Sequence, residues 1–176
     1  MTRTPRIALF GGTFNPVHTG HLLVAEAAKE TCHLDRVVFM PAGLPPHKKA
    51  PRTSSRDRLA MLRLAVRGNP ALEVSDWDAR QNRVVYTYET VEHFRKKWPR
   101  ARLFFILGSD SMKNLPKWRE SRRLRRLCRF FPFKRLAPFA SHDIRRRVQR
   151  GSSVRYLVPD AEERYIRRKR LYRQPE

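Results

Sequence analysis

Short apolar runs alternate with helix-spaced apolar segments along this chain. Runs of strand length occupy residues 6–10, 36–40, 72–74 and 102–108. Helical spacing follows at residues 19–31, after Ser54 or Ser55, and from Thr87 to Trp98, where Pro99 stops the helix. Such alternation is typical of parallel β-α units, whose ligands bind at the carboxyl ends of the strands. The pattern predicts an α/β fold, a Rossmann-like doubly wound parallel sheet with helices on both faces and a helical C-terminus.

The length and the cysteine content limit the class of protein. A chain of 176 residues suits one domain, residues 1–176, with a core of its own. No apolar run approaches the roughly 20 residues of a membrane span, and the first residues lack the apolar segment of a signal peptide. Two cysteines, Cys32 and Cys128, make no disulfide framework. We therefore expect a cytoplasmic protein with no membrane partner.

The charge is strongly positive. The formal net charge is +23, and most of it falls after residue 98. Such a charge attracts ATP, other phosphates and nucleic acid without specificity. Solvated arginine-rich helix faces are the favoured explanation, since no nucleic-acid recognition module is visible. Nucleic-acid binding is therefore expected to be non-specific at most.

The segment GGTFNPVHTGH, residues 11–21, carries the strongest chemical signal. Two glycines follow the first strand, and the next helix begins just beyond, so backbone N–H groups are available to an anion. His18 and His21 lie three residues apart and share one face if the first turn is helical. We interpret the segment as a phosphate site with two histidine donors. If the two histidines bound a metal ion, a third ligand would be needed, and none lies nearby with ligand spacing. Without the glycines and the preceding strand, two such histidines would be interpreted as ordinary helix-surface residues. The dinucleotide and P-loop patterns are absent.

This segment resembles the G-G-T-F-[DN]-P-x-H-x-G-H signature of the nucleotidylyltransferases, in particular of bacterial nicotinate mononucleotide adenylyltransferases. The resemblance implies transfer of the adenylyl group of ATP to nicotinate mononucleotide in NAD biosynthesis, with release of pyrophosphate. The attacking phosphate is already an anion, so the site needs positioning and positive charge rather than a general base. Mg²⁺ would enter bound to ATP, and the sequence shows no carboxylate cluster for a dedicated metal site.

The resemblance also implies roles for individual residues. Catalysis falls to His18 and His21. Binding of ATP and its phosphates falls to Gly11, Gly12, Thr13, Phe14, Lys48, Arg56, Gly108, Asp110, Ser141 and Arg145. Binding of nicotinate mononucleotide falls to Asn15, His47, Thr87, Tyr88 and Trp118.

Most of these residues also have a simpler structural explanation. His47 and Lys48 lie in a basic loop that could be merely solvated, and Arg145 is one of three consecutive arginines. An ion pair with Asp57 would explain Arg56. Trp118 could be a core residue. Helix capping would explain Thr87, Asp110 and Ser141.

The resemblance is weak over residues 121–140. There the chain is shortened, so that a strand of the family pattern is missing, and His142 stands where the later family motif has threonine. A missing strand predicts a smaller sheet or an exposed sheet edge. Residues 141–172 again resemble the helical C-terminal part of the family. Two other functions stay open: transfer to nicotinamide mononucleotide or another phosphate monoester, and a catalytically weakened protein that binds nucleic acid. Homo-oligomer formation stays open as well.

Overall fold

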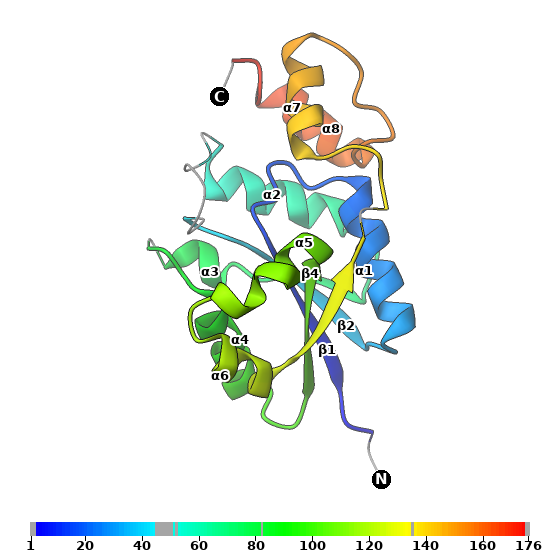
Figure 1. Ribbon diagram of the computed structural model, residues 1–176. Coiled ribbons are helices and arrows are strands. Elements are labelled where there is room, and N and C mark those ends of the chain that lie inside the picture. Colours follow the sequence, from blue (N-terminus) through cyan, green and yellow to red (C-terminus); the bar gives the residue numbers. More distant parts are fainter. Residues whose placement is uncertain (1–2, 45–50, 52, 82, 135, 175–176) are drawn as a thin grey trace.

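The protein is built on a parallel sheet (Figure 1). The computed structural model describes residues 3–44, 51, 53–81, 83–134 and 136–174. Within them the strand order is β3-β2-β1-β4-β5, and every neighbouring pair is parallel. The strands are β1 (Arg6–Gly12), β2 (Arg36–Pro41), β3 (Leu72–Val74), β4 (Arg102–Gly108) and β5 (Arg129–Phe133). The α/β doubly wound fold predicted from the sequence is confirmed.

Helices connect the strands and extend beyond them. The helices are α1 (Thr19–Thr31), α2 (Ser55–Ala65), α3 (Trp77–Arg80), α4 (Thr87–Lys97), α5 (Ser109–Asn114), the 3₁₀ helix η1 (Leu115–Lys117), α6 (Ser121–Leu127), α7 (Ser141–Gln149) and α8 (Asp160–Arg168). The predictions of α1, of α2 capped by Ser54, and of a last helix after Pro159 are confirmed. In Figure 1 the strands run upward, and α7 and α8 lie beyond their carboxyl ends.

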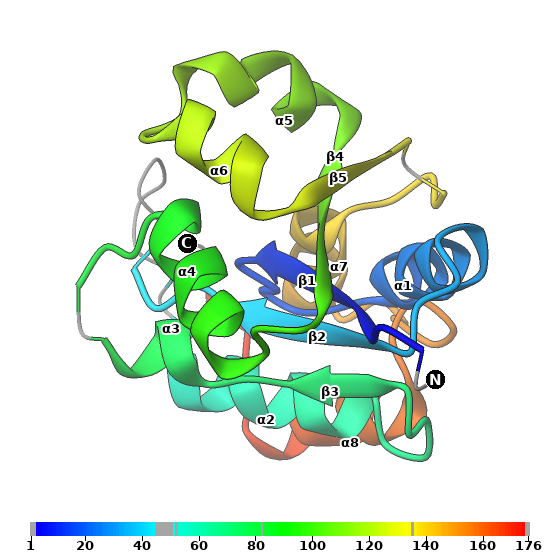
Figure 2. The same cartoon turned by 90° about the horizontal axis from the view of Figure 1, so that it is seen from below.

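Alternation along β1 divides the core into two layers. Ala8 and Phe10 pack with buried residues of α1, α2 and α8, whereas Ile7 and Leu9 pack with those of α4 and α6. Figure 2 shows α1 and α4 on opposite sides of β1. Because successive side chains of a strand point to opposite faces, both faces of β1 are buried, and β1 reads as a continuous apolar run.

The strand register brings several strand ends to one edge of the sheet. Gly12 pairs with Pro41 of β2, and on the other side Gly108 of β4 pairs with Phe133 of β5. The carboxyl ends of parallel strands are where ligands bind in open α/β sheets. The glycine turn of residues 11–12 therefore opens onto the same edge as the later glycine of β4.

The strand β5 forms one edge of the sheet. It pairs with β4 and with no other strand among the described residues, as expected from the shortened region. Pro132 in its middle is exposed. Proline has no N–H to offer a further strand, so it protects the edge from pairing with another chain.

Two helix N-termini differ from the sequence prediction. The N-cap of α4 is Tyr86 rather than Thr87, and the Glu89 carboxylate accepts the backbone N–H of Tyr86 at 2.9 Å. The N-cap of α5 is Gly108 rather than Asp110. A side chain three residues inside a helix can thus satisfy the cap residue's own N–H, which the preference for Ser, Thr and Asp at caps does not reveal.

The N-terminus of α7 is the third such correction. Ala140 is its N-cap, and the Asp143 carboxylate accepts the Ala140 N–H at 2.9 Å. Because Asp143 satisfies this end, the Ser141 hydroxyl is available for another partner and donates to the Pro16 carbonyl at 2.8 Å. Residue 141 therefore joins α7 to the loop of residues 11–21.

The short helix α3 corrects another expectation. The segment around Asp78 and Arg80 reads as a polar loop from its composition, yet residues 77–80 form one helical turn. The Arg80 guanidinium pairs with the Asp76 carboxylate at 2.8 Å across this turn. An i,i+4 ion pair favours a helical turn that single-residue propensities do not predict.

Glu162 of α8 is completely buried. Both of its carboxylate oxygens are enclosed without a hydrogen-bond partner among the described residues, and burial raises the pKa of this carboxyl well above its usual range. At pH values between the unfolded and the folded pKa, Glu162 therefore keeps a proton in the folded chain that it has released in the unfolded chain. Stability then falls as pH rises above the unfolded pKa of about 4.5, by up to about 1.4 kcal/mol per pH unit, until the folded pKa is reached.

We expect Glu162→Gln to become more stable than the wild type as pH rises, because the amide carries no proton to lose. Urea unfolding at pH 5 and pH 8 measures the difference. Glu163→Gln, at the neighbouring and partly exposed position, is the control and should show little pH-dependent gain. A constant difference between Glu162→Gln and the wild type at both pH values would contradict the prediction.

Candidate active site

A cavity of about 630 Å³ lies at the carboxyl ends of the strands. Its floor is made by residues at the ends of β1, β2, β4 and β5, among them Gly11, Met40, Gly108 and Phe133. The volume suits a ligand of nucleotide size. The position agrees with the expectation that ligands bind at this edge of the sheet.

Most of the site residues expected from the sequence line this cavity. They are Gly11, Gly12, Thr13, Phe14, Asn15, His21, Thr87, Gly108, Trp118, Ser141 and Arg145. Four others do not line it, namely His18, Arg56, Tyr88 and Asp110. His47 and Lys48 lie outside the described residues.

His21 faces the cavity as a neutral hydrogen-bond donor. Its Nδ1 accepts the backbone N–H of His18 at 3.2 Å. Burial, and next the neighbouring His18, lower the pKa of His21 to about 3. A neutral imidazole with Nδ1 accepting carries its proton on Nε2. The fold thus supplies an N–H donor at this position without a net charge.

His18 has a different place from the one expected. Its side chain is 7% exposed, and its ring lies against His21, with the centroids 3.7 Å apart, and edge-on to Phe139 at 5.4 Å. The two histidines do not point side by side into the cavity, because α1 begins only at Thr19 and His18 is its extended N-cap. His18 thus lies against the ring of His21 and contributes to the lowered pKa of His21.

The glycine loop depends on close packing. A Cβ on Gly12 would meet the ring of Phe14 at 2.9 Å, closer than real contacts allow. Phe14 itself has φ of 48°, in the left-handed region that non-glycine residues rarely adopt. Gly12 therefore lets the Phe14 ring fold back under the loop, and the loop turns sharply out of β1.

The loop is held by α7 from the far part of the chain. Arg145 Nη1 donates to the Asn15 carbonyl at 2.8 Å, one residue before the carbonyl that accepts from Ser141. Both side chains also line the cavity. The guanidinium of Arg145 thus lies at the loop and in the cavity wall, rather than on a solvated helix face.

Arg58 is a residue that the sequence reasoning missed. It is 1% exposed and donates to three carbonyls: Nη1 to Thr13 at 2.8 Å and to Ala42 at 2.7 Å, and Nη2 to Gly43 at 3.1 Å. It therefore ties the loop after β1 to the loop after β2. The available signal was its spacing of three and four residues from Met61 and Leu62, which places it on the buried face of α2.

Arg56, by contrast, lies exposed at the start of the same helix. Its charge acts on Asp57, whose carboxylate also accepts from the hydroxyls of Ser54 and Tyr165, and these contacts lower the Asp57 pKa against the opposing effect of burial. The structure does not bring Arg56 to the cavity wall. Arg56 thus belongs with the polar contacts that join α2 to α8.

The opposite end of the cavity is lined by Thr87 at the start of α4 and by Trp118 after η1. Trp118 is half-buried, and its ring meets Phe105 edge-on, with the centroids 6.4 Å apart. The backbone N–H groups at the start of α4 are suited to an anion. This part of the wall therefore combines an aromatic surface with the N-terminus of a helix.

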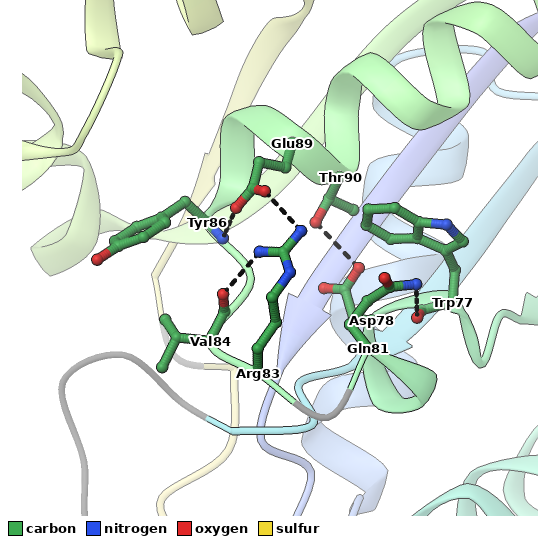
Figure 3. A network of polar contacts seen from close by, with 8 residues as sticks. All are labelled: Trp77, Asp78, Gln81, Arg83, Val84, Tyr86, Glu89 and Thr90. Carbon is green, nitrogen blue, oxygen red and sulfur yellow. Dashed lines mark hydrogen bonds and ion pairs between the residues drawn. The ribbon is translucent and has the colours of Figure 1, made fainter.

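Asp78 is a second residue that the sequence reasoning missed. It lines the cavity, and its Oδ1 accepts from the Thr90 hydroxyl at 2.9 Å (Figure 3). Burial is the main cause that raises the Asp78 pKa to about 6, with a further contribution from Glu89 and an opposing one from Thr90. An anion bound beside Asp78 would favour its protonated form further, because like charges repel.

A network of polar contacts fixes the N-terminus of α4. Arg83 Nη2 donates to Glu89 Oε1 at 2.8 Å, while Glu89 Oε2 accepts the Tyr86 N–H. Arg83 Nη1 also donates to the Val84 carbonyl at 3.0 Å (Figure 3). The bond from Arg83 is the largest cause that lowers the Glu89 pKa. The network orders the turn that presents Thr87 to the cavity.

Tyr88, expected to bind ligand, lies beside this turn and outside the cavity wall. Its ring stacks at 6.4 Å from Tyr86 and receives the guanidinium of Arg123 at 5.9 Å. Asp110 is exposed in the first turn of α5 and likewise outside the wall. Each of these two residues has a neighbour in its helix that does line the cavity, because successive residues of a helix point in different directions.

The described residues show neither a metal cluster nor a membrane-spanning helix. No group of three His, Cys, Asp or Glu side chains is arranged there to hold a metal ion. Among the residues that the structure describes, no helix is long and apolar enough to cross a membrane.

Comparison with known proteins places the site in context. A family model for cytidylyltransferase-like proteins matches residues 9–163. A probable nicotinate-nucleotide adenylyltransferase from Synechococcus sp. is 39% identical and covers 97% of this chain and 98% of its own. One from Thermomicrobium roseum is 40% identical and covers 96% and 92%. The structure of a putative nicotinate-nucleotide adenylyltransferase from Vibrio parahaemolyticus superposes with a TM-score of 0.82 at 21% identity, covering 97% of both chains.

The alignments also bear on the shortened region. The match to the Synechococcus protein extends over 198 positions, more than the 176 residues of this chain. The relative thus contains residues that have no counterpart here, as expected for an internal shortening. In the structure three residues beside this region line the cavity, namely Phe133 at the end of β5, Ala140 at the N-cap of α7 and His142 within α7.

Proposed function

Because this chain belongs to the cytidylyltransferase-like family and to its nicotinate-nucleotide adenylyltransferases, we propose that it transfers the adenylyl group of ATP to nicotinate mononucleotide. The products are nicotinate adenine dinucleotide and pyrophosphate, and the reaction belongs to NAD biosynthesis. The observation that carries the proposal is that one cavity joins two sites. The glycine loop with His21 and Arg145 lies in its wall, as do Thr87 and Trp118.

The reaction requires no protein nucleophile. A phosphate oxygen of nicotinate mononucleotide attacks the α-phosphorus of ATP, a new P–O bond forms, and the bond to pyrophosphate breaks. Negative charge develops on the transferring and leaving groups, so donors fixed in advance stabilise the transition state. We assign His21 Nε2–H and the Arg145 guanidinium to this task, since the loop and α7 hold both of them at the cavity.

The acceptor is recognised at the other end of the cavity. We assign the carboxylate of the pyridine ring to the N-terminus of α4 at Thr87, and the ring itself to the indole of Trp118. A pyridinium over an indole face is attracted by stacking and by cation–π interaction, worth about 1–2 kcal/mol when desolvated. The main alternative acceptor is nicotinamide mononucleotide, which has an amide in place of the carboxylate.

Mg²⁺ is proposed to enter as part of the substrate, bound to the phosphates of ATP. Hard oxygen ligands suit Mg²⁺, and the triphosphate supplies them. Cys32 and Cys128 are free thiols, which supports a reducing compartment such as the cytoplasm. Non-specific nucleic-acid binding and self-association stay predictions.

Pyrophosphate release from MgATP tests the proposed function directly. Nicotinate mononucleotide and nicotinamide mononucleotide are compared as acceptors at equal concentrations. We expect release with the acid and much less with the amide. A folded protein that releases pyrophosphate with neither acceptor would overturn the proposal, and a preference for the amide would replace the acceptor.

We expect Trp118→Ala to raise KM for nicotinate mononucleotide far more than KM for ATP. The loss of a contact worth about 1–2 kcal/mol corresponds to roughly a tenfold change. Steady-state kinetics with each substrate varied in turn measures both constants. Trp77→Ala is a matched control, because Trp77 stacks on His93, with the rings 4.4 Å apart, and does not line the cavity. Equal effects of Trp118→Ala on both KM values would indicate a packing role.

A further inference from the structure

A tyrosine from beyond α8 contacts the glycine loop. The Tyr172 hydroxyl donates to Asn15 Oδ1 at 2.8 Å, across 157 positions of the sequence. Both side chains are buried, at 7% and 6% exposure, and the hydroxyl also lies 3.9 Å from Met61 Sδ. Asn15 lines the cavity, whereas Tyr172 does not. Tyr172 therefore contacts the cavity wall through Asn15.

The backbone is strained on both sides of this contact. Tyr172 has φ of 62° and Arg170 has φ of 52°, and on the loop side Phe14 has φ of 48°. Residues with a Cβ avoid this left-handed region and hold it where the surrounding structure imposes it. Such strain is concentrated at sites where it serves function. The chain after α8 thus turns sharply to place the Tyr172 ring beneath the loop.

We propose that Tyr172 is a positioning residue for the acceptor, and that its hydroxyl sets the orientation of the Asn15 side-chain amide in the cavity wall. This inference rests on the proposed function. An amide presents an oxygen on one edge and an NH₂ group on the other, and the two differ by a half-turn. A hydroxyl that donates to Oδ1 selects one of these two orientations. The NH₂ group then points away from Tyr172, where it can donate to the phosphate of nicotinate mononucleotide.

The loop backbone has separate supports. Arg145 and Ser141 hold the carbonyls of Asn15 and Pro16, and Arg58 holds that of Thr13. None of these hydrogen bonds includes the Tyr172 hydroxyl, and Tyr172→Phe keeps the aromatic ring that packs in the core. The effect should therefore fall on the orientation of the amide, not on the path of the loop.

The chain offers a matched control. The Tyr165 hydroxyl donates to Asp57 Oδ1, also at 2.8 Å, and Tyr165 is 9% exposed and packs in the same core layer. Tyr165→Phe therefore removes a tyrosine hydrogen bond of the same length, but one that joins α8 to α2 and does not reach the cavity. The two variants should lose similar thermal stability and differ in kinetics.

The test compares Tyr172→Phe, Tyr165→Phe and the wild type in pyrophosphate release. We expect Tyr172→Phe to lower kcat/KM for nicotinate mononucleotide about tenfold or more, mainly through KM, with KM for ATP nearly unchanged. Tyr165→Phe should match the wild type. Introduced into an Asn15→Ala background, Tyr172→Phe should have no further kinetic effect, because the amide it orients is absent.

Each outcome bears on one claim. An active wild type with equal kinetics for the two phenylalanine variants would overturn the positioning role, as would a full effect of Tyr172→Phe in the Asn15→Ala background. Melting temperatures measured in parallel separate a kinetic effect from unfolding. A wild type that releases no pyrophosphate would instead overturn the proposed function, and this inference with it.

Discussion

Replacing His21 by alanine should lower kcat about a hundredfold or more, while the chain remains folded. The magnitude is that of losing one preorganised donor to the charge of a transition state. The structure supplies such a donor: Nδ1 is occupied by the backbone N–H of His18, so the proton of the neutral ring lies on Nε2. Pyrophosphate release at saturating MgATP and nicotinate mononucleotide measures kcat.

The pH dependence gives this prediction a second readout. With a pKa of about 3, His21 stays neutral throughout the range from pH 5 to pH 8, so its donor is present at every pH in that range. His21 itself should therefore contribute no step to the pH profile of kcat. His33→Ala, at an exposed position, is the control for loss of an imidazole. A folded His21→Ala chain with near-normal kcat would exclude His21 from catalysis.

Replacing Arg58 by alanine should be the most destabilising single change considered. It removes three hydrogen bonds that a charged donor makes to the carbonyls of Thr13, Ala42 and Gly43. A hydrogen bond to a charged group is worth about 1.5–3 kcal/mol, and three bonds from one side chain add up to less than their separate values, because water reaches these partly exposed residues once the guanidinium is gone. We expect the free energy of unfolding to fall by about 3–5 kcal/mol.

Urea unfolding of Arg58→Ala and Arg56→Ala at one pH measures this effect. Arg56 is the matched control, since it lies two residues away on the same helix and is exposed. Its removal should change stability by no more than about 0.5 kcal/mol. Arg58→Lys should recover only part of the loss, because an ammonium lacks the planar fork that reaches three carbonyls. Similar losses of stability in Arg58→Ala and Arg56→Ala would contradict the role of Arg58 in joining the loops after β1 and β2.

The secondary structure was largely predictable, because local patterns dominate it. The apolar runs of β1, β2 and β4 are flanked by glycine or proline, and α1 was predicted with its observed bounds. The errors lie at helix starts and at the short helix α3, which reads as a loop. Tyr86 and Ala140 are unusual N-caps, and each depends on a carboxylate three residues later. A bond between a cap N–H and a carboxylate three residues later can be recognised in the sequence only after the helix start is known.

The site was predictable where it follows a compact motif. The glycine loop, His21, Thr87 and Trp118 all reach one cavity. Arg58 and Asp78 were missed, because in sequence an arginine on a helix and an aspartate in a polar stretch resemble solvated residues. Burial distinguishes them, and burial is a property of the tertiary packing. For His18 the ligand contact suggested by its motif position stays a prediction, and in the structure its ring lies against that of His21.

The contacts of the glycine loop with α7 and Tyr172 have a consequence for protein synthesis. Ser141, Arg145 and Tyr172 follow their loop partners by 125, 130 and 157 positions. A ribosome makes the amino-terminal part first, so the loop and Arg58 leave it long before these three partners exist. A nascent chain therefore completes the supports of the loop only after residue 172 has emerged. A chain whose translation stops before residue 141 lacks all three of these late contacts.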